Sequence, residues 1–215
     1  MAVRIVIAED EALIRLDLQE TLEEEGYEVV GAVGRGDHAV ELVRELSPDL
    51  AILDIMMPGM DGITAAQEIT KRRWAAVLIL SAHSQRDLFK RARNAGVFGY
   101  LVKPFQKNDL VPAIELALGR FADLRIVEAA MKDAKDEIAA HRLVARAVAI
   151  LMDSGKLTES AAFSLIQKTA MRQRVKKRDI AQQIVEGTWV TTPQPHQGWS
   201  PACRRQGCEP RLSRA

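Results

Sequence analysis

Five polar side chains stand at the ends of short apolar runs in the sequence: Glu9, Asp10, Asp54, Ser81 and Lys103. Three carboxylates brought together would repel one another and raise their own pKa values, so a positive partner is required. Mg²⁺ is a suitable partner, because it prefers oxygen ligands and keeps positions for water and for a phosphoryl oxygen. Lys103 adds a point charge for an anion, and Ser81 adds a hydroxyl donor. These residue types predict phosphoryl transfer with Asp54 as the covalent acceptor, since a carboxylate is already a nucleophile.

The elements that must position these side chains alternate between two periods. Short, mostly apolar runs of the kind found in buried strands cover residues 3–8, 27–33, 50–54, 76–80 and 98–102. Each run is followed by apolar residues at helical spacing, over residues 13–22, 39–46, 63–69, 88–95 and 110–118. Five strand–helix pairs predict an α/β fold with a doubly wound, five-stranded parallel sheet and helices on both faces. Ligands of such sheets bind beyond the carboxyl ends of the strands, where the five polar residues fall.

A single long helix is predicted from about residue 109 to residue 151. No glycine lies between Gly119 and Gly155, and no proline follows Pro112 in this stretch. Several apolar residues in it fall near a seven-residue period: Phe121, Leu124, Met131, Ile138 and Ala145. Charged residues interrupt the alternate positions of that period: Glu128, Lys135 and Arg142. The helix is therefore either a coiled coil or an alanine-rich linking helix packed on its own domain.

A small all-α unit of three helices is predicted to follow the sheet. Thr158 should begin its second helix, which runs to about Met171, and residues 177–186 supply the third before Gly187. The predicted domains are residues 1–120 for the sheet domain, 121–138 for the linking helix, 139–190 for the helical domain and 191–215 for a tail. The tail holds half of the eight prolines, and we expect it not to fold on its own.

The net charge of +1 conceals an uneven distribution along the chain. Residues 1–118 carry a net charge of −6, residues 119–190 carry +4 and residues 191–215 carry +3. An acidic first half suits a domain that handles a cation, and a basic second half suits a polyanionic partner. With 47% apolar and 27% charged residues, the composition is that of a globular protein and excludes wholesale disorder.

Several classes of protein are excluded by simple patterns. No apolar run approaches the length of about 20 residues that a membrane span needs. The first residues lack the basic region and longer apolar stretch of a secretory signal, so we expect a cytoplasmic protein that makes no membrane contact. The two cysteines, Cys203 and Cys208, both fall in the tail, so no disulfide framework is expected.

The polar residues at the strand ends also carry a resemblance to a known family. For one aspartate a role as a helix cap or turn residue would be the default, but an ordered set at four strand ends argues against it. Residues 1 to about 120 resemble the receiver domain of bacterial two-component response regulators, in a CheY-like fold with strand order 2-1-3-4-5. The matching stretches are residues 7–11, 49–62, 80–82 and 99–105.

The receiver resemblance implies roles for individual residues in the phosphoacceptor site. Asp54 would accept a phosphoryl group from a sensor histidine kinase, and Lys103 would contact that group. Mg²⁺ would be bound by Asp10, Asp54 and the backbone carbonyl of Met56, with Glu9 assisting through water. Glu9 stands where many relatives have aspartate, a mild departure that should not abolish metal binding. A receiver can dephosphorylate itself, but it is not a dedicated enzyme.

The resemblance also implies a conformational switch. The hydroxyl of Ser81 would move toward the phosphoryl group while the ring of Tyr100 turns inward, and the Lys103–Pro104 peptide bond would be cis. Adding about −1.5 to −2 charges at Asp54 would bias a packed surface that already has two states. That surface is formed by the fourth helix, the fifth strand and the fifth helix, and the fifth helix continues directly into the second domain.

The helical domain resembles the ANTAR domain, an RNA-binding module of transcription antitermination regulators. The matching stretches are residues 142–152, 160–166 and 180–185. Residues 145–148 read Ala-Arg-Ala-Val where relatives often have Ala-Lys-Gly-Ile. The resemblance implies binding to RNA stem-loops near transcription terminators, whose stabilisation would let the polymerase read through.

Basic residues supply the expected RNA contacts. Residues 168–178 contain six cations and no acid, a pattern that can also be only a solvated face. The residues assigned to RNA binding are Arg142, Arg146, Lys156, Lys168, Arg172, Arg174, Lys176, Lys177 and Arg178. Of the two aromatic residues here, we expect Phe163 in the core, so base recognition should rest on polar and arginine contacts.

These observations together predict a phosphorylation-controlled response regulator that binds RNA stem-loops and promotes antitermination. Phosphorylation would expose or pair the long helix, so that the two output domains of a homodimer engage RNA together. Two alternatives remain open. One is a DNA-binding response regulator, and the other is a receiver that acts only by dimerisation and protein contact.

Overall fold

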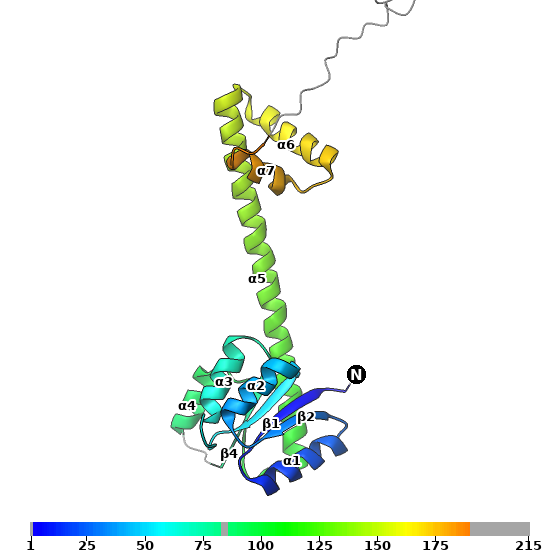
Figure 1. The fold of residues 1–215 in the computed structure, drawn as a ribbon, viewed down its shortest axis with the longest axis vertical. Coiled ribbons are helices and arrows are strands. Elements are labelled where there is room, and N and C mark those ends of the chain that lie inside the picture. The colour runs from blue at the N-terminus through cyan, green and yellow to red at the C-terminus, as the bar shows by residue number, and fades with distance from the viewer. Residues whose placement is uncertain (1, 83–85, 190–215) are drawn as a thin grey trace, which may run out of the picture. The chain divides into compact units, whose positions relative to one another are not determined.

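The computed structural model describes residues 2–82 and 86–189 of the 215-residue chain. The predicted tail, residues 191–215, lies outside the described residues. The chain divides after Lys132 into two compact units (Figure 1). Within the described ranges, no helix combines the length and the apolar content that a membrane span requires.

The first unit is built on a sheet of five parallel strands. The strands are β1 (Arg4–Ala8), β2 (Glu28–Val33), β3 (Leu50–Asp54), β4 (Ala76–Ser81) and β5 (Gly99–Val102). Their order across the sheet is β2-β1-β3-β4-β5, and every neighbouring pair is parallel. This confirms the predicted fold class and strand order. The order reverses between β1 and β3, so the carboxyl ends of these two strands flank the point where ligands bind in such sheets.

Helices cover both faces of the sheet. They are α1 (Ala12–Glu24), α2 (Gly36–Leu46), α3 (Gly62–Lys71), α4 (Arg86–Asn94) and the long α5 (Lys107–Gly155). Successive strand residues point to opposite faces, so Ile5 and Ile7 pack with α1 and the start of α5, whereas Val6 and Ala8 pack with α2 and α3. The apolar, fully buried strands β3 and β4 result from this two-sided cover.

The long helix α5 runs unbroken through the stretch where one helix was predicted. Its first turns belong to the core of the first unit, where Phe121 is 7% exposed and packs edge-to-face on Phe98. Further along, Ile126, Met131 and Ile138 are each more than half exposed. The seven-residue apolar period therefore combines a core residue with side chains that lie in solvent.

The second unit packs two short helices, α6 (Glu159–Gln173) and α7 (Lys177–Val185), on the last part of α5. The hydroxyl of Thr158 accepts a hydrogen bond from the backbone N–H of Ala161, which is the N-terminal cap predicted for α6. The core consists of small and aliphatic residues, among them Ala147, Leu151, Ala162, Ile166, Ile180 and Ile184. The predicted three-helix unit is confirmed.

The expectation that Phe163 lies in this core is wrong. Its side chain is 41% exposed. Helix α6 turns Ala162, Ile166 and Ala170 toward the core at a spacing of four residues, and all three are buried. Residue 163 lies one step of about 100° round the helix from that face, so its ring projects to the side.

Candidate functional site

The strand ends bring three of the predicted site residues into direct contact. Glu9 follows β1, Asp54 is the last residue of β3, and Lys103 follows β5. The ammonium of Lys103 lies 2.7 Å from Oδ1 of Asp54 and 2.5 Å from Oε2 of Glu9. The side chains of Glu9 and Asp54 are only 1% and 7% exposed, so Lys103 neutralises two buried carboxylates at once.

Burial and charge act in opposite directions on the titration of this cluster. Burial raises the pKa of Glu9 above its usual value, although the hydrogen bond and the charge of Lys103 act to lower it. Burial acts to lower the pKa of Lys103, but hydrogen bonds to Asp54 and Glu9 outweigh it and raise the pKa. Lys103 is therefore held in its cationic form, the state that can receive a phosphoryl anion.

The loop after β3 holds the carboxylate of Asp54 from its other side. The backbone N–H of Met56 donates a 2.6 Å hydrogen bond to Oδ2 of Asp54, and the N–H of Gly62 donates to the carbonyl of Ile55 at 3.0 Å. A Cβ atom on Gly62 would lie 1.8 Å from the carbonyl oxygen of Asp54. Only glycine fits there, so Gly62 fixes the approach of the loop to the acceptor residue.

The two other residues of the predicted metal site have exposed side chains. The side chain of Asp10 is exposed, and that of Met56 is 66% exposed, although the backbone N–H of Met56 bonds to Asp54. Within residues 2–82 and 86–189, no three His, Cys, Asp or Glu side chains converge closely enough to hold a metal ion. Lys103 occupies the space between the two buried carboxylates instead.

The donor set nevertheless fits a hard cation. Oε1 of Glu9 is buried and has no hydrogen-bond partner among the described residues. A buried carboxylate oxygen without a partner is costly and favours a bound water or cation beside it. Carboxylates from β1 and β3 together with a loop carbonyl are the oxygen ligands that Mg²⁺ accepts in proteins.

The switch residues predicted from the resemblance lie on the neighbouring strands. Ser81 is buried at the end of β4, and its carbonyl accepts a 2.7 Å hydrogen bond from the N–H of Lys103. The half-buried ring of Tyr100 on β5 packs edge-on against Phe89 of α4, with ring centres 5.5 Å apart. The Lys103–Pro104 bond is cis, as predicted.

Two supporting residues had no role in the sequence-based prediction. Gly62 stands in a matching stretch, and the signal that could have identified it is a glycine at the first position of a helix directly after the acceptor loop. Arg15 of α1 donates hydrogen bonds to the carbonyls of Glu9 and Asp10. Its position in the first turn of α1, five residues after Asp10, was a weak signal, because an arginine on a helix is usually exposed.

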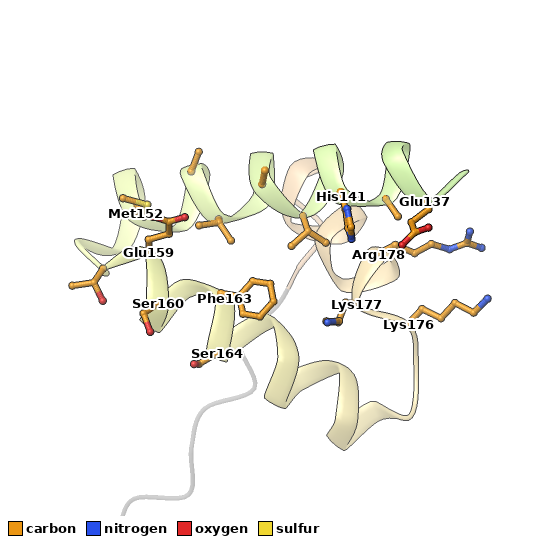
Figure 2. Close-up of a pocket in the computed structure, with 16 residues that line it drawn as sticks. Glu137, His141, Met152, Glu159, Ser160, Phe163, Ser164, Lys176, Lys177 and Arg178 are labelled. Carbon is orange, nitrogen blue, oxygen red and sulfur yellow. The ribbon is translucent and has the colours of Figure 1, made fainter. Parts of the chain in front are cut away.

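The nine basic residues predicted to bind RNA are all exposed in the second unit. They do not form one cluster. Lys176, Lys177 and Arg178 line a groove of about 1140 Å³ between α5, α6 and α7, which is drawn in Figure 2. Arg142 and Arg146 line a separate, smaller groove of about 450 Å³ along α5. The other four lie outside both grooves.

Comparison with known proteins agrees with the two units. The family model of the response regulator receiver domain matches residues 5–115, and that of the ANTAR domain matches residues 132–185. The chain is 48% identical over 183 residues to the transcriptional regulatory protein PdtaR of Mycobacterium tuberculosis. That alignment covers 85% of this chain and 89% of PdtaR.

Solved structures resemble the first unit. The signal receiver domain of the response regulator NarL from Mycobacterium tuberculosis is 32% identical with a TM-score of 0.53, covering 55% of this chain and 97% of that one. A chain of the CheX-CheY-BeF3-Mg²⁺ complex from Borrelia burgdorferi is 26% identical with a TM-score of 0.50, covering 52% of this chain and 86% of that one. With sheet, strand-end cluster and both family models in agreement, this chain belongs to the two-component response regulators that join a receiver domain to an ANTAR domain.

Proposed function

We propose that the chain is a phosphorylation-controlled regulator that binds RNA stem-loops near transcription terminators and promotes antitermination. The observation that carries this proposal is the pairing, in one chain, of a buried acceptor carboxylate held by Lys103 with an ANTAR domain whose nine assigned cations are all exposed. Exposed cations on a small helical domain suit the phosphates of a nucleic acid.

The phosphoryl group would come from a phosphohistidine of a sensor histidine kinase. A carboxylate oxygen of Asp54 forms the new P–O bond as the P–N bond breaks, and the departing imidazole takes up a proton. Lys103 lies 2.7 Å from that carboxylate and meets the negative charge that arrives with the phosphoryl group. The N–H of Met56 keeps the other carboxylate oxygen oriented.

Asp10, Asp54, the carbonyl of Met56 and Glu9 are the residues that would hold Mg²⁺. The ion would supply positive charge to the transferring oxygens when bound. This assignment is supported by Oε1 of Glu9, which has no partner among the described residues, and by the Mg²⁺ named in the complex of the structural relative. Asp10 directly follows Glu9 in the chain, and its side chain is exposed.

Phosphorylation would act on the output domain through a shift between two states of the packed surface. Ser81 is the last residue of β4, and its carbonyl is bonded to the N–H of Lys103. Tyr100 lies on β5, and its ring packs against Phe89 of α4. Pairing of two copies through exposed apolar residues of α5, such as Ile126 and Met131, would let two ANTAR domains engage one RNA. Such bivalent binding raises the affinity without any new contact.

RNA binding can be distinguished from DNA binding by competition at matched salt. We expect hairpin RNA to displace duplex DNA of equal length from the protein. The logarithm of the RNA association constant should fall linearly with the logarithm of salt concentration, with a slope of about −0.7 per phosphate contact if the loop is single-stranded. Preferential binding of the DNA duplex would support the DNA-binding alternative. No binding to either nucleic acid at low salt would favour action by protein contact alone.

A further inference from the structure

The groove between α5, α6 and α7 in the ANTAR domain has an apolar floor and polar ends. It lies between the last part of α5 and the first turns of α6 and α7 (Figure 2). Val144, Val148 and Met152 of α5 line it together with Phe163 of α6. Its volume of about 1140 Å³ slightly exceeds the range of about 300–1,000 Å³ found for small-molecule pockets, so it has room for a nucleobase with its sugar.

The groove presents the ring of Phe163 and the imidazole of His141, and the benzene ring of Phe163 is the apolar aromatic surface of the two. Its side chain is 41% exposed although apolar residues surround it, and the core residues of α6 lie on another face of the helix. The ammonium of Lys177 lies 5.3 Å from the centre of the ring. This distance is within the range of a cation–π contact, which favours a position of the Lys177 ammonium beside the ring.

The polar lining of the groove differs between its two ends. Lys176, Lys177 and Arg178 lie at the end formed by α7, where Figure 2 also places Glu137 and, beside it on α5, His141. Ser160 and Glu159 lie toward the other end, near Met152. Three cations against one acid at the α7 end favour an anionic group there. Hydroxyl and carboxylate groups at the other end can bond to the edge of a base.

We propose that this groove receives one unpaired base of an RNA loop, stacked on Phe163, with the adjoining phosphates on Lys176, Lys177 and Arg178. Loop bases that are splayed out of a stem are recognised in this way, because every base has a face that stacks on an aromatic ring. The inference rests on the proposed RNA binding and specifies where the base enters. A helix from another protein would also fit an apolar groove, but the cations that flank Phe163 favour an anionic partner.

The test uses the full chain and a stem-loop RNA selected for binding from a pool with randomised loops. Each loop base in turn is replaced by 2-aminopurine, whose fluorescence falls when the base stacks. We expect one loop position to report stacking with the unaltered protein. Phe163→Leu keeps an apolar side chain but removes the aromatic face, and should weaken binding about tenfold and abolish the fluorescence change. Met171→Leu is the matched control, since Met171 lies on the same helix, is 68% exposed and does not line the groove.

The outcomes separate this inference from the proposed function. On the intact RNA, Phe163→Leu should bind more weakly than the unaltered protein. If the two proteins bind equally well to an RNA whose reporting loop position is abasic, the groove is supported as the site of that base. If Phe163→Leu binds the RNA as tightly as Met171→Leu does, while Lys176→Gln with Lys177→Gln binds weakly, the base site is overturned and RNA binding stands. If Phe163→Leu alters only the oligomeric state in sedimentation, the groove holds protein, and the inference fails. If no stem-loop is selected from the pool, both the base site and the proposed RNA-binding function fail.

Discussion

Lys103→Met is expected to destabilise the receiver domain by about 3 kcal/mol. In the unaltered protein Lys103 contacts the carboxylates of Asp54 and Glu9 at 2.7 and 2.5 Å, and its own side chain is only 15% exposed. Methionine fills similar space without the charge, so two buried carboxylates would be left facing each other. The free energy of unfolding, measured by urea titration at neutral pH, checks this expectation.

Lys107→Met is the matched control for this substitution. Lys107 also contacts two carboxylates, Glu24 and Glu25, but its side chain is 45% exposed and solvent screens the pair. We expect the free energy of unfolding of the control to be close to that of the unaltered protein.

Added Mg²⁺ should raise the free energy of unfolding more in Lys103→Met than in the unaltered protein, because the ion replaces the missing positive charge and binds only the folded state. Equal stability of the two variants would show that Lys103 does not neutralise this site.

Gly62→Ala is expected to have the second largest effect. A Cβ atom there would lie 1.8 Å from the carbonyl oxygen of Asp54, and neither backbone can yield as a flexible side chain would. The collision must push the acceptor strand and the start of α3 apart. We expect a loss of roughly 1–3 kcal/mol in the free energy of unfolding and a much slower phosphorylation of Asp54, since the carboxylate moves with its strand.

Gly119→Ala shows what the same substitution does without a collision. Gly119 is an exposed residue inside α5, and apart from the neighbouring backbone of its own helix no described atom lies within 4 Å of the position its Cβ would take. Alanine should stabilise the helix by about 0.5–1 kcal/mol, the opposite sign to Gly62→Ala. Phosphorylation of the control should proceed at the unaltered rate. A Gly62→Ala protein that matches this control in stability and phosphorylation would contradict the close packing described at the acceptor loop.

The strand ends could be predicted from the sequence because each apolar run is visible in a short stretch of residues, and the alternation of these runs with helices specifies a parallel sheet. Buried parallel strands require continuous apolar runs, and parallel strands bring their carboxyl ends to one edge, so Glu9, Asp54, Ser81 and Lys103 had to meet. The N-terminal cap at Thr158 was predictable for a similar reason, since a hydroxyl at that position satisfies a backbone N–H of the first turn.

Other features depend on details that one sequence does not carry. The closeness of Gly62 to Asp54 arises from two backbones meeting across a loop, whereas a glycine beside a turn can equally supply a positive φ angle. The direction of Phe163 depends on which face of α6 meets α5 and α7, and a phenylalanine among apolar residues is most often buried. Lys103 contacts Glu9 as well as Asp54. The order of the strand ends predicts that these residues lie near one another, but not which side chains make contact.

We expect a phosphoryl group on Asp54 of the receiver domain to control RNA binding by the ANTAR domain. The most direct measurement is the affinity of the full chain for a bound stem-loop RNA, with and without a small-molecule phosphodonor, beside Asp54→Asn under the same conditions. We expect the phosphodonor to tighten binding by the unaltered protein by at least about tenfold through paired ANTAR domains, and to leave Asp54→Asn unchanged. Equal affinity of the phosphorylated protein, the unphosphorylated protein and Asp54→Asn would contradict the coupling.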